Sequence, residues 1–120
     1  MKKSACAAIA CLMLLADGAA AGPNRYGAIA FSESTYELGW AGDRYSRADA
    51  DNSAMRFCLR RARDCRIVMW VRNACMALAS GDEGWGTAYS TSKSEAVAIA
   101  MENCQENSDG CRLRIKYCSR

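Results

Sequence analysis

Apolar and polar residues alternate with a period of two in two segments of the chain, which is the pattern of a half-buried β-strand. From Cys111 to Cys118 basic residues separate three apolar ones, Leu113, Ile115 and Tyr117. From Cys65 to Arg72 the residues expected to face inward are Ile67, Met69 and Val71, and those expected to face outward are Arg66, Val68, Trp70 and Arg72. The cysteine that opens each segment has inward parity. Both segments are therefore predicted to be strands whose inner face packs against helices.

Each of these strands is preceded by a segment that begins like a helix. Ser46 and Ser92 are N-cap candidates, and an acidic residue, Asp49 or Glu95, follows three residues later. Ser92 with Glu95 matches a capping box. Small residues then recur at every fourth position and share one helix face: Ala50, Ala54 and Cys58 in the first segment, Ala96, Ala100 and Cys104 in the second. Such a face allows a helix to lie close to a sheet.

These elements belong to an internal repeat, with a first copy at about residues 26–72 and a second at about 75–118. Gly27–Ala30 corresponds to Met76–Ala79, and Gly39-Trp40 is matched with Gly84-Trp85, which favours a structural role for both tryptophans. Each copy reads as strand, strand, helix, strand. We expect an α+β fold in which two pseudo-twofold-related repeats form a sheet with helices packed on one face. The strand order stays open.

The first 21 residues have the order of a secretory signal peptide. Lys2 and Lys3 precede an apolar run, and three alanines that end at Ala21 follow. The apolar run is shorter than the roughly 20 residues that a spanning helix needs. We therefore expect cleavage near Ala21, one exported domain at residues 22–120 that is periplasmic or secreted, and no membrane insertion of the mature chain.

Six of the eight cysteines lie beyond the expected cleavage site. An even number in a small exported chain predicts a disulfide framework. A zinc site is disfavoured because the chain has no histidine and no CxxC pair. The helix end and the inward strand start are close in each copy, which predicts the pairs Cys58–Cys65 and Cys104–Cys111. Cys75 and Cys118 are then left to pair with each other.

The composition excludes several classes of function. The absence of histidine removes the Ser-His-Asp and Cys-His catalytic systems. The mature chain has fourteen basic and twelve acidic residues, a net charge of +2, which is too small to predict nucleic-acid binding. Carboxylate-only chemistry stays open through the neighbouring acids Asp82-Glu83 and Asp49-Asp51, although acids are also favoured at turns and helix starts. No catalytic residue, metal or cofactor is predicted.

A protein-binding surface is the remaining candidate site. Arginines are dense between residues 56 and 66, where the second copy has Glu102 and Glu106. They could form a solvated face or a patch that steers an acidic partner. Trp70 is flanked by arginines on the outer face of its strand, as a binding hot spot would be, or else is covered by a neighbouring element. The candidate partner-binding residues are Trp70, Val68, Arg66, Arg72, Arg56 and Arg60.

Three segments of the chain carry a resemblance to a known family. YGAIAFS at residues 26–32, CRIVMWVRNAC at 65–75 running into MALA, and CRLRIKYC at 111–118 resemble the domain-of-unknown-function family 4189, which consists of small exported bacterial proteins. The resemblance covers nearly all of residues 22–120. It implies repeated strand and helix units with paired cysteines, and it supplies no catalytic residues. It further implies contact with other proteins, as periplasmic immunity proteins or exported effectors.

The expected function is therefore that of a non-enzymatic exported module that binds another protein. The favoured partner is an exported toxin or lytic enzyme, which the module would inhibit. Two alternatives stay open: a secreted effector that acts on another cell, and a small cell-envelope hydrolase that uses carboxylates alone. The oligomeric state is left open.

Overall fold

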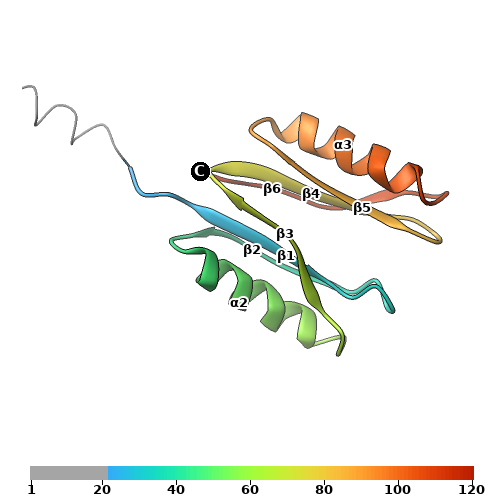
Figure 1. Cartoon of the computed structure of the whole chain (residues 1–120), viewed down its shortest axis with the longest axis horizontal. Coiled ribbons are helices and arrows are strands. Elements are labelled where there is room, and N and C mark those ends of the chain that lie inside the picture. The colour runs from blue at the N-terminus through green and yellow to red at the C-terminus, as the bar shows by residue number, and fades with distance from the viewer. Residues whose placement is uncertain (1–21) are drawn as a thin grey trace, which may run out of the picture.

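The structure is a computed structural model that describes residues 22–120, and it contains two three-stranded antiparallel sheets and two helices (Figure 1). The first repeat contains β1 (Tyr26–Phe31), β2 (Leu38–Arg44), α2 (Arg47–Leu59) and β3 (Arg66–Arg72). The second contains β4 (Ala74–Ser80), β5 (Trp85–Ser90), α3 (Lys93–Gln105) and β6 (Arg112–Ser119). The α+β class and the strand-strand-helix-strand repeats are confirmed. The expected signal peptide lies outside the described residues.

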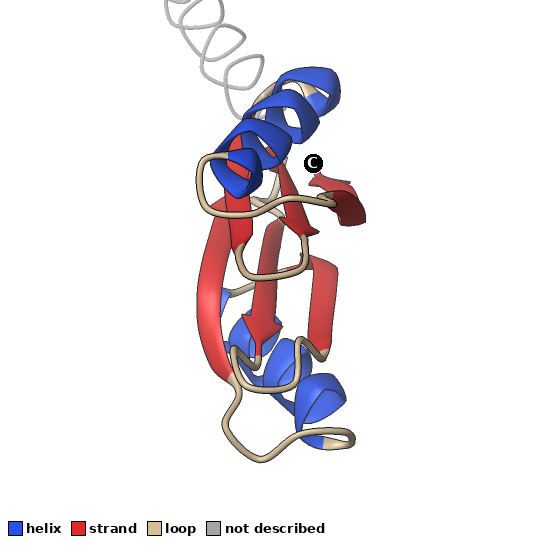
Figure 2. Cartoon of the chain, turned by 90° about the vertical axis from the view of Figure 1, so that its right-hand side faces the viewer, coloured by secondary structure: helices blue, strands red, loops and turns tan. Residues whose placement is uncertain are grey.

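The sheets have the strand orders β2-β1-β3 and β5-β4-β6, and they pack face to face between the two helices (Figures 1 and 2). The arrangement differs from a single sheet that carries both helices on one face. The central strands explain the difference because both of their faces are apolar. Ala28 and Ala30 of β1 pack against α2, whereas Ile29 and Phe31 pack against Met76 and other residues of the opposite sheet.

An extra residue in the last strand of each repeat, β3 and β6, changes the predicted parity of its side chains. The β1–β3 register shifts between Ile29 and Ala30, which leaves Val68 unpaired, and the β4–β6 register shifts at the equivalent place. A bulge of this kind moves the following side chains to the other face. Ile67 therefore packs on the helix side as expected, but Met69 and Val71 pack between the sheets. Trp70 pairs with Ala28 and lies on the helix side.

Two glycines mark where each helix crosses its sheet. Gly39 pairs with Ala30, and Gly86 pairs with Ala79, so these glycines are equivalent in the two repeats. A Cβ atom on Gly39 would lie 2.3 Å from the Ala54 carbonyl oxygen of α2. The register corrects the match made from the sequence, because the counterpart of Trp40 is the next residue after Gly86, a threonine, and not a second tryptophan.

The structure contains three disulfides, Cys58–Cys65, Cys75–Cys118 and Cys104–Cys111, which are the pairs that spacing and parity predict. Two of them join the end of a helix to the strand that follows. The third joins directly opposite residues of β4 and β6. Three disulfides in a domain of this size indicate an oxidising compartment. In the described part of the chain, no helix is long and apolar enough to cross a membrane.

Asp64, in the loop before β3, holds the turn between β1 and β2. The hydroxyl groups of Ser32 and Ser34 donate to its two carboxylate oxygens, at 2.6 and 2.7 Å. These bonds favour the ionised form and lower the pKa of Asp64 below the usual range of an aspartate. Because the folded-state pKa is the lower one, this stabilisation is present above the unfolded-state pKa and is lost as the pH falls through the folded-state pKa.

We therefore expect Asp64→Asn to lower the free energy of unfolding near neutral pH and to change it little in acid. Urea unfolding of wild type and variant at a series of pH values measures this difference, which should shrink as the pH falls below about 4. A difference that stays constant from about pH 6 to about pH 2 would contradict the assignment.

Candidate protein-binding grooves

The structure does not bring the six predicted partner-binding residues together. Val68, Trp70 and Arg72 line one groove beside β3. Arg66 lies away from them, where it forms an ion pair with Glu33. Arg56 lies on α2, and Arg60 is the residue that caps its C-terminal end. Of these two only Arg60 lines a groove, which runs along the opposite side of the first sheet. The single predicted patch is thus divided between two grooves, one on each open side of the sheet pair.

The larger groove, here called the β2 groove, has a volume of about 660 Å³. Its floor is the backbone of β2. One wall is the C-terminal end of α2, and the other is β6 of the opposite sheet. The side chains that line it include three aromatic residues, Trp40, Phe57 and Tyr117, and four arginines, Arg44, Arg60, Arg61 and Arg114.

The aromatic side of the β2 groove is a packed pair of rings that joins the two sheets. Trp40 and Tyr117 have ring centroids 4.8 Å apart. Gly42 leaves room for this contact, because a Cβ atom there would lie 2.2 Å from the Tyr117 ring. The Tyr117 hydroxyl donates to the Asp43 carboxylate, and this hydrogen bond raises the pKa of Tyr117. Trp40 still exposes 37% of its surface, so the groove presents a fixed aromatic face.

The arginines of the β2 groove differ in whether a carboxylate neutralises them. Arg61 lies 3.8 Å from the Glu37 carboxylate, and Arg44 lies 3.7 Å from that of Asp49. Arg60 lies over the Phe57 ring at 5.0 Å, and Arg114 donates to the Ser80 hydroxyl at 2.9 Å. Neither of these two guanidinium groups has a carboxylate partner within residues 22–120. They leave two uncompensated positive charges, one on each wall.

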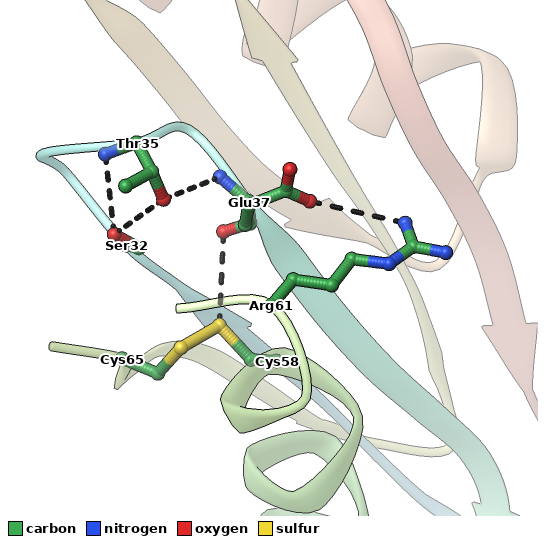
Figure 3. Close-up of polar contacts among 6 residues, drawn as sticks. All are labelled: Ser32, Thr35, Glu37, Cys58, Arg61 and Cys65. Carbon is green, nitrogen blue, oxygen red and sulfur yellow. Dashed lines mark hydrogen bonds and ion pairs between the residues drawn. A yellow bond between two sulfur atoms is a disulfide. The ribbon is translucent and has the colours of Figure 1, made fainter. Parts of the chain in front are cut away.

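A hydrogen-bonded turn fixes the end of the β2 groove (Figure 3). The Thr35 hydroxyl donates to the Ser32 hydroxyl at 2.9 Å, and the Glu37 amide donates to the Thr35 hydroxyl at 3.3 Å. The Glu37 carbonyl oxygen lies 3.7 Å from the sulfur of Cys58, whose disulfide anchors the end of α2. The start of β2 thus contacts the end of α2, and the ion pair between Glu37 and Arg61 joins the two elements.

The second groove, here called the β3 groove, has a volume of about 490 Å³ and is mainly apolar. Its lining includes Val68, Met69, Trp70, Arg72 and Tyr89. Trp70 exposes 42% of its surface, and the Arg47 guanidinium lies over its ring at 4.3 Å. Arg47, at the start of α2, therefore already covers part of the ring that the sequence suggested for a partner.

The repeat shows which features of the β2 groove the fold does not require. The residues of the second repeat at the positions of Trp40, Phe57 and Arg60 are a threonine, an asparagine and a glutamate. The second repeat builds the same strands, helix and local disulfide with these different residues. The aromatic and basic character of the β2 groove is thus an addition to the shared fold, not a condition for it.

Two of the four acids considered for hydrolytic chemistry are engaged in ion pairs. Asp49 forms an ion pair with Arg44, and Asp51 lies 3.3 Å from Arg47. Glu83 lines a hollow of about 480 Å³ together with Glu33, which pairs with Arg66. Among residues 22–120, no three His, Cys, Asp or Glu side chains are grouped so that they could hold a metal ion.

Sequence reasoning missed Trp40, Tyr117 and Arg114 as members of a surface site. Trp40 was assigned a structural role because its Gly-Trp pair was matched with a second one, and the register removes that match. Tyr117 was expected to face the helix side together with Leu113 and Ile115, but the register shift in β6 leaves only Leu113 there and places Ile115 and Tyr117 between the sheets. The Tyr117 ring also forms the groove wall. Aligning the repeats on the two helix-crossing glycines would have revealed Trp40 as an unmatched aromatic residue.

Comparisons with known proteins bear on the family and not on the function. Neither a curated protein nor a solved structure matches the chain. The model of one family, described as a domain of unknown function (DUF4189), matches residues 26–118, which include all the strands and both helices except for the last residue of β6. The chain therefore belongs to the DUF4189 family.

Proposed function

We propose that this protein is an exported, non-enzymatic module that binds and inhibits another exported protein, in the manner of an immunity protein against a toxin or lytic enzyme. One observation carries the proposal: the β2 groove combines exposed aromatic rings with two guanidinium groups that have no carboxylate partner among residues 22–120. At the positions of Trp40, Phe57 and Arg60 the second repeat has a threonine, an asparagine and a glutamate. Aromatic residues and arginine are the side chains that dominate protein interfaces.

Export through the signal peptide at residues 1–21 is part of the proposal. The disulfides support it, because structural disulfides form and persist in the periplasm or outside the cell. An inhibitor in that location meets exported toxins and lytic enzymes directly. A rigid scaffold also suits inhibition, because a surface that is fixed before binding loses little conformational entropy on association.

The test is affinity capture with the mature, oxidised protein from periplasmic and culture fractions of its own organism, followed by mass spectrometry of what stays bound. A stoichiometric exported toxin or lytic enzyme whose activity falls on binding is the expected result. If no partner is captured from the fractions of its own organism and the protein itself is found outside the cell, the proposal fails and the secreted-effector alternative is favoured.

The two exposed tryptophans allow the binding face to be identified. We expect Trp40→Ala to weaken partner binding by about 30-fold or more, because truncation of a central interface aromatic costs about 2 kcal/mol or more. Trp70→Ala is the matched control, since it removes the same ring from the β3 groove, and it should change the affinity by less than about threefold. Isothermal titration calorimetry of variants with unchanged circular dichroism measures both effects. The reverse order would place the site at the β3 groove, as first predicted from the sequence.

A specific observation keeps the hydrolase alternative open as a second candidate. Glu33 and Glu83 line one hollow together with Tyr36 and Trp85, and paired carboxylates beside aromatic rings are suited to sugar chemistry. Release of reducing ends from purified peptidoglycan by the wild type, and not by Glu83→Gln, would favour this candidate over the inhibitor.

A further inference from the structure

We infer that the partner presents an acidic, extended segment, which adds to the first sheet as a fourth strand along the free edge of β2. The inference rests on the proposed function, since it specifies what the β2 groove binds. It is carried by the unpaired edge of β2, by the charge of the groove walls and by a difference between the two repeats.

The outer edge of β2 is available for strand pairing. β2 pairs only with β1 in the described structure, and residues 37–42 form the floor of the groove. In an antiparallel sheet, every second residue of an edge strand directs its N–H and C=O groups away from its neighbour. One end of this edge is already used, because the Asp43 amide donates to the Ser119 hydroxyl at 3.1 Å. The β1–β2 register shifts beyond Ala41, so the regular open part runs from Leu38 to Ala41, about 14 Å of strand.

The equivalent edge strand of the second repeat is engaged by its own helix. The Asn103 side chain of α3 donates to the backbone carbonyl of Thr87 in β5, at 3.1 Å. At the equivalent positions of the first repeat stand Phe57 and Trp40, and a phenyl ring offers no such donor. The first repeat thus lacks the side chain that occupies its sister edge, and it has aromatic rings on both sides of the open backbone instead.

The charges around the open edge select an acidic segment. Side chains of an added strand point alternately to the two faces of the sheet. On the helix face they approach Arg60 and Phe57, and on the other face they approach Arg114 and Tyr117. The only carboxylate in the lining is Glu37, which Arg61 already neutralises. Carboxylates at one position on each face, next to apolar or aromatic residues, would pair with the two free guanidinium groups.

The probe is a displayed library of random 12-residue peptides, selected against the mature, oxidised protein. We expect the enriched peptides to carry Asp or Glu alternating with β-branched or aromatic residues. Backbone N-methylation of a selected peptide should then weaken binding at every second position, by about tenfold or more, and have little effect at the positions between. Enriched peptides without acidic residues, or an N-methyl scan without alternation, would overturn the inference.

A pair of charge reversals separates the groove from the overall charge of the protein. Arg60→Glu with Arg114→Glu should weaken peptide binding by about 100-fold or more, because each reversal replaces an attractive pair with a repulsive one. Arg56→Glu with Arg112→Glu is the matched control, because it makes the same change of net charge near the same helix end and on the same strand but outside the groove. It should cost less than about threefold. Equal effects of the two double variants would show that only long-range charge acts, which would also overturn the inference.

The outcome for the captured partner distinguishes this inference from the proposed function. If the partner is captured but its binding resists the groove charge reversals, the protein is an inhibitor that uses another surface, and only the strand inference falls. If the double variant abolishes a self-association seen by analytical ultracentrifugation, the occupant is a second copy of this chain, and the inference of a foreign acidic strand is wrong. Failure of capture itself removes the proposed function.

Discussion

Replacement of both Cys75 and Cys118 with serine should lower the free energy of unfolding by about 4 kcal/mol. The disulfide closes a separation of 43 residues, and the chain-entropy argument assigns a cross-link of that length about 4 kcal/mol through its restriction of the unfolded chain. Domains of about 100 residues have net stabilities of only 5–15 kcal/mol, so the loss is a large part of the total. Cys75 is also fully inaccessible and belongs to the cluster under α3, against which the partly buried Cys118 packs.

Chemical denaturation of the oxidised proteins measures the effect, and the local disulfide Cys58–Cys65 gives a matched comparison. Its cysteines are only seven residues apart, so their replacement with serine should cost about 2.5 kcal/mol. The long-range variant should therefore unfold at the lower denaturant concentration. The reverse order, or an unchanged midpoint for Cys75→Ser/Cys118→Ser, would show that the loop length does not set the contribution of the bond.

Two of the three disulfides could be predicted from local features, and the pair Cys75–Cys118 followed because no other cysteines were left. The seven-residue spacing occurs twice, and the inward parity of Cys65 and Cys111 places each next to the end of its own helix. The helix starts were equally accessible, since the Ser46 and Ser92 hydroxyl groups accept from the backbone amides of Asp49 and Glu95. Both signals depend on residues that are close in the sequence, where geometry leaves few choices.

The layer arrangement could not be predicted in the same way, because it depends on contacts between the two repeats. The alternation in β1 separates alanines from larger residues, and this is a difference in size rather than in polarity. A pattern of apolar and polar positions does not distinguish alanine from larger apolar residues. The alanine face accepts a helix, and the face with Ile29 and Phe31 fills the space between two sheets. The bulge at Val68 is also invisible in the pattern, because both faces that it exchanges are apolar.

The candidate site was the least accessible part, because both grooves join elements from different repeats. Tyr117 and Arg114 of β6 meet Trp40 of β2 only once the two sheets are stacked. The dense arginines at the C-terminal end of α2 distinguish this helix end from its sister in the sequence itself. Arg114 and Tyr117, which complete the groove from β6, could not be assigned to the same site before the stacking of the two sheets was known. A site that is formed by residues of both repeats therefore cannot be recognised from the sequence of either repeat alone.

Gly39→Ala should lower the free energy of unfolding by about 3 kcal/mol, although the change adds a single methyl group. The new Cβ atom would lie 2.3 Å from both the Ala54 carbonyl oxygen and the Cys58 amide nitrogen. These are backbone atoms of α2, so no side-chain rotation relieves the contact. The helix must move away from β2, and the buried layer of Ala50, Ala54 and Cys58 loses its packing against the sheet.

The same displacement should reach the β2 groove, because Phe57 and Arg60 follow Ala54 on the helix that moves. Thermal and denaturant unfolding measure the stability, and calorimetry with the captured partner measures the binding. Gly22→Ala is the control, since a Cβ atom there meets nothing within 4 Å. Gly86→Ala should destabilise the protein to a similar extent, with its Cβ atom 2.4 Å from the Cys104 amide, but it should leave partner affinity unchanged in the folded fraction. If Gly39→Ala and Gly86→Ala weaken binding equally, then the partner does not depend on the position of α2, and the β2 groove is not its site.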